Sequence, residues 1–262
     1  MRFEFKYLVP LAQYESLKGA LLPFLKRDPF AAQQENGLYT VRSIYFDSPG
    51  FEMYHTKVEG IAHRMKVRLR GYNIGDDHSK VFMEIKRKYE GPILKNRSHT
   101  SFGVVKQLFN GADFETLADQ IFNPDNARRF FYQILRNNLQ PVVNVIYERE
   151  PFLGNTVDIE NDFRCTFDLH LRGVAYPKVG ELYIEKDVHF AFPGFFILEV
   201  KFNRYCPAWI KPVLEDFKLR KEPASKYVGA INASGFINVA RRHDVFAKSA
   251  LLESYLDEPL PM

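Results

Sequence analysis

Lysine and arginine side chains recur at every second position in part of this chain. The stretch MKVRLRGYN, residues 65–73, carries Lys66, Arg68 and Arg70 in this spacing, with apolar residues between them. Because side chains alternate across a β-strand, the three cations would share one face of the strand. Arginine offers a planar fork and lysine a compact charge, and both bind phosphate oxygens. The spacing therefore indicates a phosphate-binding strand, although a solvent-exposed face explains a single strand of this kind more simply.

Other segments repeat the pattern and change that interpretation. An apolar face opposite a charged face is predicted for residues 2–9, 81–91, 162–173 and 195–203, and alternation also predicts strands at 39–47 and 143–150. The charged faces repeat lysine and arginine with isolated glutamates, whereas a solvated face usually mixes both signs with neutral polar residues. We therefore expect an α+β fold: an antiparallel β-barrel tunnel of about eight strands with a polar basic lumen, covered by helices.

Helices to cover the outside of such a tunnel are also predicted. Apolar residues at three- and four-residue spacing favour helices at 10–27, 126–139, 207–219, 225–235 and 244–256. Ser225 precedes the fourth of these and suits a helix cap rather than a nucleophile, since no base lies near it in the sequence.

A lumen lined with converging cations needs a counter-charge. Two unit cations about 7 Å apart repel by roughly 2 kcal/mol at an effective dielectric constant near 20, so several together would be costly without anions. A chain of phosphates would remove this cost. The glutamates among the cations, Glu4, Glu84 and Glu199, are poor anion ligands but suit Mg²⁺ or Mn²⁺, whose shell phosphate oxygens can complete.

Composition and motifs limit the other function classes. The net charge of +4 is too mild to indicate nucleic-acid binding, and the basic strand faces offer few aromatic side chains for base stacking. The sequence has no GxxxxGK[ST], GxGxxG or HExxH motif. Cys165 and Cys206 form no CxxC pair, and neither a membrane span nor a signal peptide is predicted. We expect a soluble, cytoplasmic protein.

The ordered set RFEFKYLV, SIYFDS, KVRLRGY, EIKRK, FILEVKFN and ASKYVGA resembles the VTC domain, a polyphosphate polymerase domain of the CYTH, or triphosphate tunnel metalloenzyme, superfamily. The resemblance runs from residue 1 to about 235. It implies a single tunnel domain over 1–262, with a C-terminal helical tail at about 236–262. It also implies a tunnel that holds triphosphate or polyphosphate, with a divalent metal, Mn²⁺ or Mg²⁺, at one end.

The resemblance assigns roles to individual side chains. Catalytic roles fall on Lys6, Arg68, Arg70, Arg149, Arg164 and Lys226. Further phosphate-binding side chains are expected at Arg2, Lys57, Lys66, Lys86, Lys88, Lys95, Arg97 and Lys201. The metal is expected at Glu199, with Glu84 and Glu4 as further carboxylates.

Polymerase members of this family transfer the γ-phosphate of ATP to a growing polyphosphate chain and release ADP, so the resemblance predicts an ATP-dependent phosphotransferase. Hydrolytic relatives usually begin with an ExExK motif, but this chain has Arg2, Glu4 and Lys6 at those positions. Arg2 replaces a carboxylate that helps hydrolases to hold metal, and this favours the polymerase. A tunnel triphosphatase and a non-catalytic polyphosphate-binding module stay open. ATP and polyphosphate are the expected partners, and a separate membrane partner would be compatible.

Overall fold

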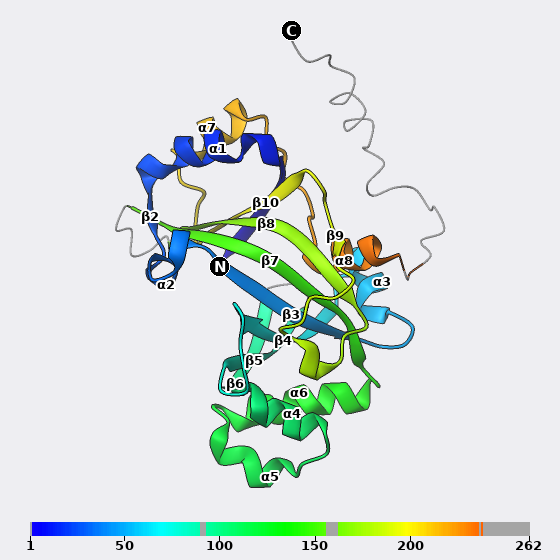
Figure 1. The fold of residues 1–262 in the computed structure, drawn as a ribbon. Coiled ribbons are helices and arrows are strands. Elements are labelled where there is room, and N and C mark those ends of the chain that lie inside the picture. Colours follow the sequence, from blue (N-terminus) through cyan, green and yellow to red (C-terminus); the bar gives the residue numbers. More distant parts are fainter. Residues whose placement is uncertain (1, 90–92, 156–161, 236, 238–262) are drawn as a thin grey trace.

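The computed structural model describes residues 2–89, 93–155, 162–235 and 237, and its centre is one antiparallel sheet of ten strands (Figure 1). The strands are β1 (Phe3–Pro10), β2 (Leu25–Arg27), β3 (Tyr39–Asp47), β4 (Arg64–Tyr72), β5 (Lys80–Lys88), β6 (Ile93–Ser101), β7 (Gln140–Gly154), β8 (Arg164–Ala175), β9 (His189–Phe190) and β10 (Phe195–Phe202). Their order is β1-β10-β8-β7-β3-β4-β5-β6, with β2 beside β7 and β9 beside β8. The predicted α+β class and antiparallel strands are confirmed.

The sheet is curled but not closed into a complete barrel. Among the described residues, the terminal strands β1 and β6 form no ladder with each other. The concave side collects the basic residues of β4 and the glutamate of β10, as the alternation predicts. The convex side carries the apolar residues of the same strands.

Helices cover the convex side in two groups. The helices are α1 (Tyr14–Leu21), α2 (Pro29–Ala32), α3 (Glu52–Val58), α4 (Phe102–Phe109), α5 (Phe114–Leu117), α6 (Pro124–Arg136), α7 (Ile210–Asp216) and α8 (Lys226–Ser234). Short 3₁₀ turns lie at Leu11–Gln13, Leu22–Phe24, Glu35–Gly37, Ala118–Gln120 and Val179–Glu181. Residues of α1 and α7 share an apolar core with β1, β8 and β10, and residues of α4 to α6 share another with β3 to β5.

Helix α8 lies on the concave side instead. Ser225 caps it by accepting a hydrogen bond from the backbone N–H of Val228, and Gly235 ends it in the left-handed conformation, at φ 70°. Tyr227 and Ile231 pack into a third apolar core with residues of β3, β7 and β8. The lumen is therefore basic over part of its length and filled by an apolar helix face over the rest.

Several element boundaries differ from the prediction. Residues 10–27 form α1 only over Tyr14–Leu21, because Pro10 ends β1 and Pro23, without an N–H, stops the helix. The helices expected at 126–139 and 207–219 occupy Pro124–Arg136 and Ile210–Asp216. The helix expected at 244–256 lies outside the described residues, as does nearly all of the expected tail at 236–262. No helix in the described ranges combines the length and apolar character needed to cross a membrane.

Candidate anion-binding site

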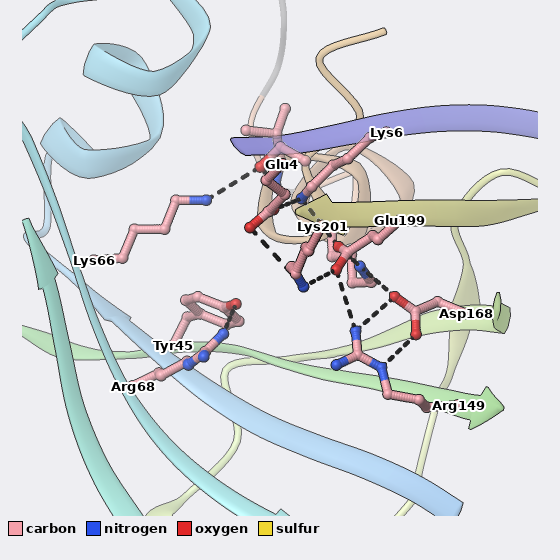
Figure 2. Close-up of polar contacts among 12 residues, drawn as sticks. Glu4, Lys6, Tyr45, Lys66, Arg68, Arg149, Asp168, Glu199 and Lys201 are labelled. Atoms are coloured by element: carbon pink, nitrogen blue, oxygen red, sulfur yellow. Dashed lines mark hydrogen bonds and ion pairs between the residues drawn. The ribbon is translucent and has the colours of Figure 1, made fainter. Parts of the chain in front are cut away.

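Glu199 is the centre of a dense group of charges on the concave side (Figure 2). The side chain is 5% exposed, and both carboxylate oxygens face cations. Lys6 Nζ lies 3.2 Å from Oε1, and Lys201 Nζ lies 2.7 Å from Oε2. Lys226 also contacts Oε1, and Arg149 Nη2 lies 3.5 Å from Oε2. Four predicted site residues from four different elements therefore converge on one predicted metal ligand.

Asp168 is a member of this group that the sequence did not single out. Arg149 donates to both of its oxygens, over 2.6 and 2.8 Å, and Lys226 Nζ lies 2.6 Å from Oδ2. The sequence places Asp168 on the charged face of its strand, but only the register of β7 with β8 sets it directly opposite Arg149. The charges hold the carboxylates ionised: burial would raise the pKa values of Asp168 and Glu199, yet the neighbouring cations lower both.

Glu4 extends the group toward β1. Lys6 Nζ lies 3.3 Å from one of its oxygens, and Lys201 Nζ lies 3.9 Å from the other. Burial opposes ionisation, but the charges of Lys201 and Lys6 prevail and lower the pKa of Glu4 to about 2. Glu4 and Glu199 are thus bridged by two ammonium groups.

The predicted arginine pair of β4 forms a second group. Arg68 Nε donates to Glu84 over 2.7 Å, and Arg97 Nε lies 3.2 Å from the other oxygen of that carboxylate. Burial raises the pKa of Glu84 but Arg68 and Arg70 outweigh it, leaving the pKa at about 2. Arg70 donates to Ser43 Oγ and lies 4.0 Å from Glu84, so its carboxylate contact is the longest of the three. Arg68 also donates to the hydroxyl of Tyr45, over 2.9 Å.

A cavity of about 480 Å³ opens where β1, β4 and β5 meet the segment before α8. Its charged lining is mostly cationic: Lys6, Lys57, Arg64, Lys66, Lys86, Lys88 and Lys221, against Glu4 and Glu222. We call this the lysine cavity. Lys66 contacts Ser225 Oγ over 3.3 Å, and burial, reinforced by Lys6, Lys86 and Lys57, lowers its pKa well below the usual value. Burial also lowers the pKa values of Lys57 and Lys86.

Three predicted residues lie apart from these groups. Arg2 pairs with Asp162 at 3.2 Å, and its side chain is 45% exposed. Arg164 pairs with Asp28 at 3.4 Å. Lys95 lies on β6 opposite Lys86 in register and is exposed. The structure therefore gives Arg2 and Arg164 carboxylate partners of their own, outside the contacts around Glu199.

The carboxylates fit a metal only together with phosphate. In the part of the chain that the structure describes, no three acidic, histidine or cysteine side chains form a group able to hold a metal ion. Both oxygens of Glu199 are occupied by cations, and Glu84 is paired with arginines instead of with Glu199. If Lys6 and Lys201 turned toward a bound phosphate, however, Glu4 and Glu199 would be left facing each other. Their oxygens suit Mg²⁺ or Mn²⁺, with phosphate oxygens as the remaining ligands.

Fold and site together define a class of protein: an α+β protein with a curled antiparallel sheet, whose concave face holds a dense group of basic side chains and carboxylates. The family model of the VTC domain matches residues 1–234, so the chain belongs to the VTC domain family. A search of curated proteins finds no match.

Two solved structures are similar to this chain over most of its length. A Hippeastrum protein, described as a candidate adenylyl cyclase with a dominant triphosphatase activity, is 15% identical, covers 93% of this chain and 100% of its own, and has a TM-score of 0.48. A candidate adenylate cyclase of Vibrio parahaemolyticus is 8% identical, covers 87% of this chain and 96% of its own, and has a TM-score of 0.40. At these TM-scores, neither likeness decides the activity or substrate of this chain.

Proposed function

We propose that the protein is a metal-dependent polyphosphate polymerase that transfers the γ-phosphate of ATP to the end of a polyphosphate chain and releases ADP. The observation that carries this proposal is that the paired charges around Glu199 and Glu84 are directly adjacent to the lysine cavity. Arginines and lysines held by carboxylates lie around Glu199 and Glu84, and the lysine cavity begins at Lys6 beside them. A reaction centre with room for a further polyanion suits a polymerase.

The carboxylates of the site substitute for phosphate while no substrate is bound. Glu4, Asp168 and Glu199 neutralise Lys6, Lys201, Lys226 and Arg149. A triphosphate competes for the same ammonium and guanidinium groups, so binding exchanges one set of anionic partners for another. The cations therefore do not repel one another in the free protein, because carboxylates neutralise them. They also lose little further hydration when the triphosphate binds.

Phosphoryl transfer requires in-line positioning and neutralisation of the phosphate oxygens more than covalent catalysis. Arg68, Arg70 and Arg149 would hold the transferring and flanking phosphates, while Lys6 and Lys226 orient donor and acceptor. A terminal oxygen of polyphosphate attacks the γ-phosphorus, the bond to the β-phosphate oxygen breaks, and ADP leaves. Because a terminal phosphate is already largely ionised near neutral pH, the acceptor needs no general base. A divalent ion on Glu199 would add charge neutralisation.

A tunnel triphosphatase is the alternative, with water in place of the polyphosphate acceptor. The replacement of the first glutamate of ExExK by Arg2 still favours the polymerase, because a carboxylate is missing. Arg2 does not add a phosphate-binding cation to the groups around Glu199, since it contacts Asp162 instead.

The test incubates purified protein with ATP and Mn²⁺ or Mg²⁺, with and without a short polyphosphate primer. Chains that lengthen with matching ADP support the polymerase, and orthophosphate without chains supports the triphosphatase. Neither product, despite tight polyphosphate binding, would indicate a binding module. Arg70→Ala is the informative variant because Arg70 has the longest carboxylate contact, so its removal disturbs the ion pairs least.

We expect Arg70→Ala to lower turnover by about 100-fold, in the range seen when one charge-stabilising donor is removed. Arg128→Ala is the matched control, because Arg128 forms exposed ion pairs with Glu115 and Asp125 and lies over the ring of Phe114, all on the convex side. Equal turnover by both variants would show that Arg70 takes no part in the reaction.

A further inference from the structure

The residues on the concave face change character along the strands. The register of β4 with β5 runs from a lysine pair, through an arginine–glutamate pair, to an arginine–phenylalanine pair: Lys66 with Lys86, Arg68 with Glu84, and Arg70 with Phe82. Tyr72 follows Arg70 on the same face of β4. The site therefore has a lysine end, a centre of paired charges and an aromatic end.

Five ring side chains form a continuous series at the aromatic end. We call Phe30, Tyr39, Tyr72, Phe82 and His99 the aromatic arc. Ring centroids lie 5.1 Å apart for Phe30 and Tyr39, 5.7 Å for Tyr39 and Tyr72, 5.9 Å for Tyr72 and Phe82, and 5.6 Å for Phe82 and His99. The rings come from α2 and from β3, β4, β5 and β6, four neighbouring strands at one end of the sheet (Figure 1).

The arc is accessible and touches a cation. Phe30 is 47% exposed, and Tyr72, Phe82 and His99 are half-buried. The guanidinium carbon of Arg97 lies 3.8 Å from the ring centroid of Phe82, and the Arg97 side chain is 51% exposed. Phe30, Phe82 and His99 belong to none of the three apolar cores of the described chain. Phe30 therefore has exposed surface that the apolar cores do not use, whereas Phe82 contacts Arg97 and His99 stacks on Phe122, with ring centroids 4.5 Å apart.

We infer that the aromatic arc binds the nucleobase of the nucleoside triphosphate donor. This inference rests on the proposed function, to which it adds the orientation of the donor. Rings and guanidinium planes bind bases by stacking, which needs no hydrogen-bonding pattern from the protein. The proposed ligand class is a nucleoside triphosphate, bound with little discrimination between adenine and guanine.

The position of the arc suits this ligand. Residues two apart on one strand face lie roughly 7 Å apart, so Tyr72 is one such step from Arg70 and two steps from Arg68. Tyr39 is opposite Arg149 in the register of β3 with β7. A base on the arc would thus direct its triphosphate toward the arginines, and the polyphosphate acceptor would occupy the lysine cavity at the other end.

The test compares the binding of ATP and inorganic tripolyphosphate by calorimetry, without added metal, for the wild type and Phe30→Ala. Phe30 is chosen because it is exposed and contributes to no core, so the variant should fold. We expect the affinity for ATP to fall about 5-fold or more, the effect of losing one stacked ring, and the affinity for tripolyphosphate to stay unchanged. Tyr132→Ala on α6, where Tyr132 is 53% exposed, is the matched control and should change neither affinity.

Two results would overturn the inference. Equal loss of ATP and tripolyphosphate binding would mean that Phe30 supports the phosphate site and not a base. Unchanged binding of both ligands would place the base elsewhere. Failure of the polymerase proposal is distinguishable from failure of this inference. A protein that makes no polyphosphate can still lose affinity for ATP, and not for tripolyphosphate, after Phe30→Ala.

Discussion

The charge state and the contacts of a side chain in this site depend on its neighbours more than on its residue type. Glu199, expected as a metal ligand, accepts from or pairs with Lys6, Lys201, Lys226 and Arg149. Lys66 has the opposite situation, because it is buried beside other lysines and its pKa is well below the usual value. The carboxylates outweigh burial and raise the pKa values of Lys6, Lys226 and Arg149. Lys66 lacks such an anion among the described residues.

The lowered pKa of Lys66 predicts proton uptake when phosphate binds. A bound phosphate favours the charged ammonium and raises the pKa again. Between the lower pKa of the free protein and the higher pKa of the complex, binding therefore takes up protons, and affinity falls as pH rises through that window. Calorimetry of the binding of long-chain polyphosphate, which reaches the lysine cavity that Lys66 lines, measures the uptake in buffers of different ionisation enthalpy.

Lys66→Arg separates charge from titration, because arginine stays protonated throughout this range. We expect the variant to bind long-chain polyphosphate with reduced proton uptake, the remainder coming from Lys57 and Lys86, whose pKa values are also lowered. Uptake equal to that of the wild type would mean that Lys66 is already charged in the free protein.

Among the elements, α8 is the one whose packing positions a charged side chain of the site. Its first residue, Lys226, contacts both Asp168 and Glu199, while the following Tyr227 donates to Asp47 over 2.5 Å. Asp47 in turn accepts from the backbone N–H groups at the start of α3. The position of the Lys226 ammonium group is therefore set by the packing of the whole helix.

Gly229→Ala tests this connection. A Cβ at Gly229 would lie 2.6 Å from the ring of Phe192, so either the ring or α8 must move. We expect the free energy of unfolding to fall by about 1 to 3 kcal/mol, as for an overpacked core, and tripolyphosphate affinity to fall with it. Denaturant unfolding and calorimetry measure the two effects.

Gly19→Ala in α1 is the control, since a Cβ there meets no atom within 4 Å. It should raise the free energy of unfolding by about 0.5 to 1 kcal/mol and leave binding unchanged. A destabilised Gly229→Ala protein with wild-type affinity would show that α8 does not position Lys226.

The sequence predicted the elements whose alternation is regular and missed those in which polar groups are buried. The strand at 39–47 has the predicted bounds. Strand β6 was not predicted, because its convex face carries Ser98 and Thr100, which donate to backbone carbonyls instead of being apolar. Strict alternation over 162–173 would put His170 on the same face as Asp168, but His170 has φ 49° beside a register shift between β7 and β8 and pairs with Glu148.

The candidate site was predictable in its cations but not in its ion pairs. Residue spacing places Lys6, Arg68 and Glu199 on charged strand faces, and all three lie on the concave side. Which carboxylate neutralises which cation depends on strand register and on α8, neither of which a single sequence specifies. The aromatic arc was missed for the same reason, since its five rings come from five elements.

At the scale of the whole molecule, the net charge of +4 conceals a strong local asymmetry. Acidic residues balance the centre of the concave face, and unbalanced lysines gather at one end of it. This arrangement predicts that a short anion uses the centre, while a long anion also occupies the lysine cavity.

Lys88→Gln tests this division. Lys88 lines the lysine cavity and forms no ion pair with another described residue. We expect weaker binding of long polyphosphate, with the slope of log affinity against log salt reduced by about 0.7, as for one lost contact to a single-stranded polyanion. Tripolyphosphate affinity should not change. Titrations at several salt concentrations measure both.

Lys211→Gln on α7, an exposed lysine of the convex side, is the control and should affect neither ligand. If Lys88→Gln weakened tripolyphosphate as much as the long chain, the short anion would occupy the lysine cavity and the proposed orientation of the donor would be reversed.

The two edge strands of the sheet, β1 and β6, have a consequence for how a polymer would reach the site. The described residues of β1 and β6 share no ladder: the outer edge of β1 pairs with Lys221 and that of β6 with Phe122, so no backbone hydrogen bond joins these two strands to each other. A closed ring admits a polymer only by threading one of its ends. In this sheet β1 and β6 are not joined, so, under the proposed function, we expect a long chain whose ends are both held elsewhere to enter from the side.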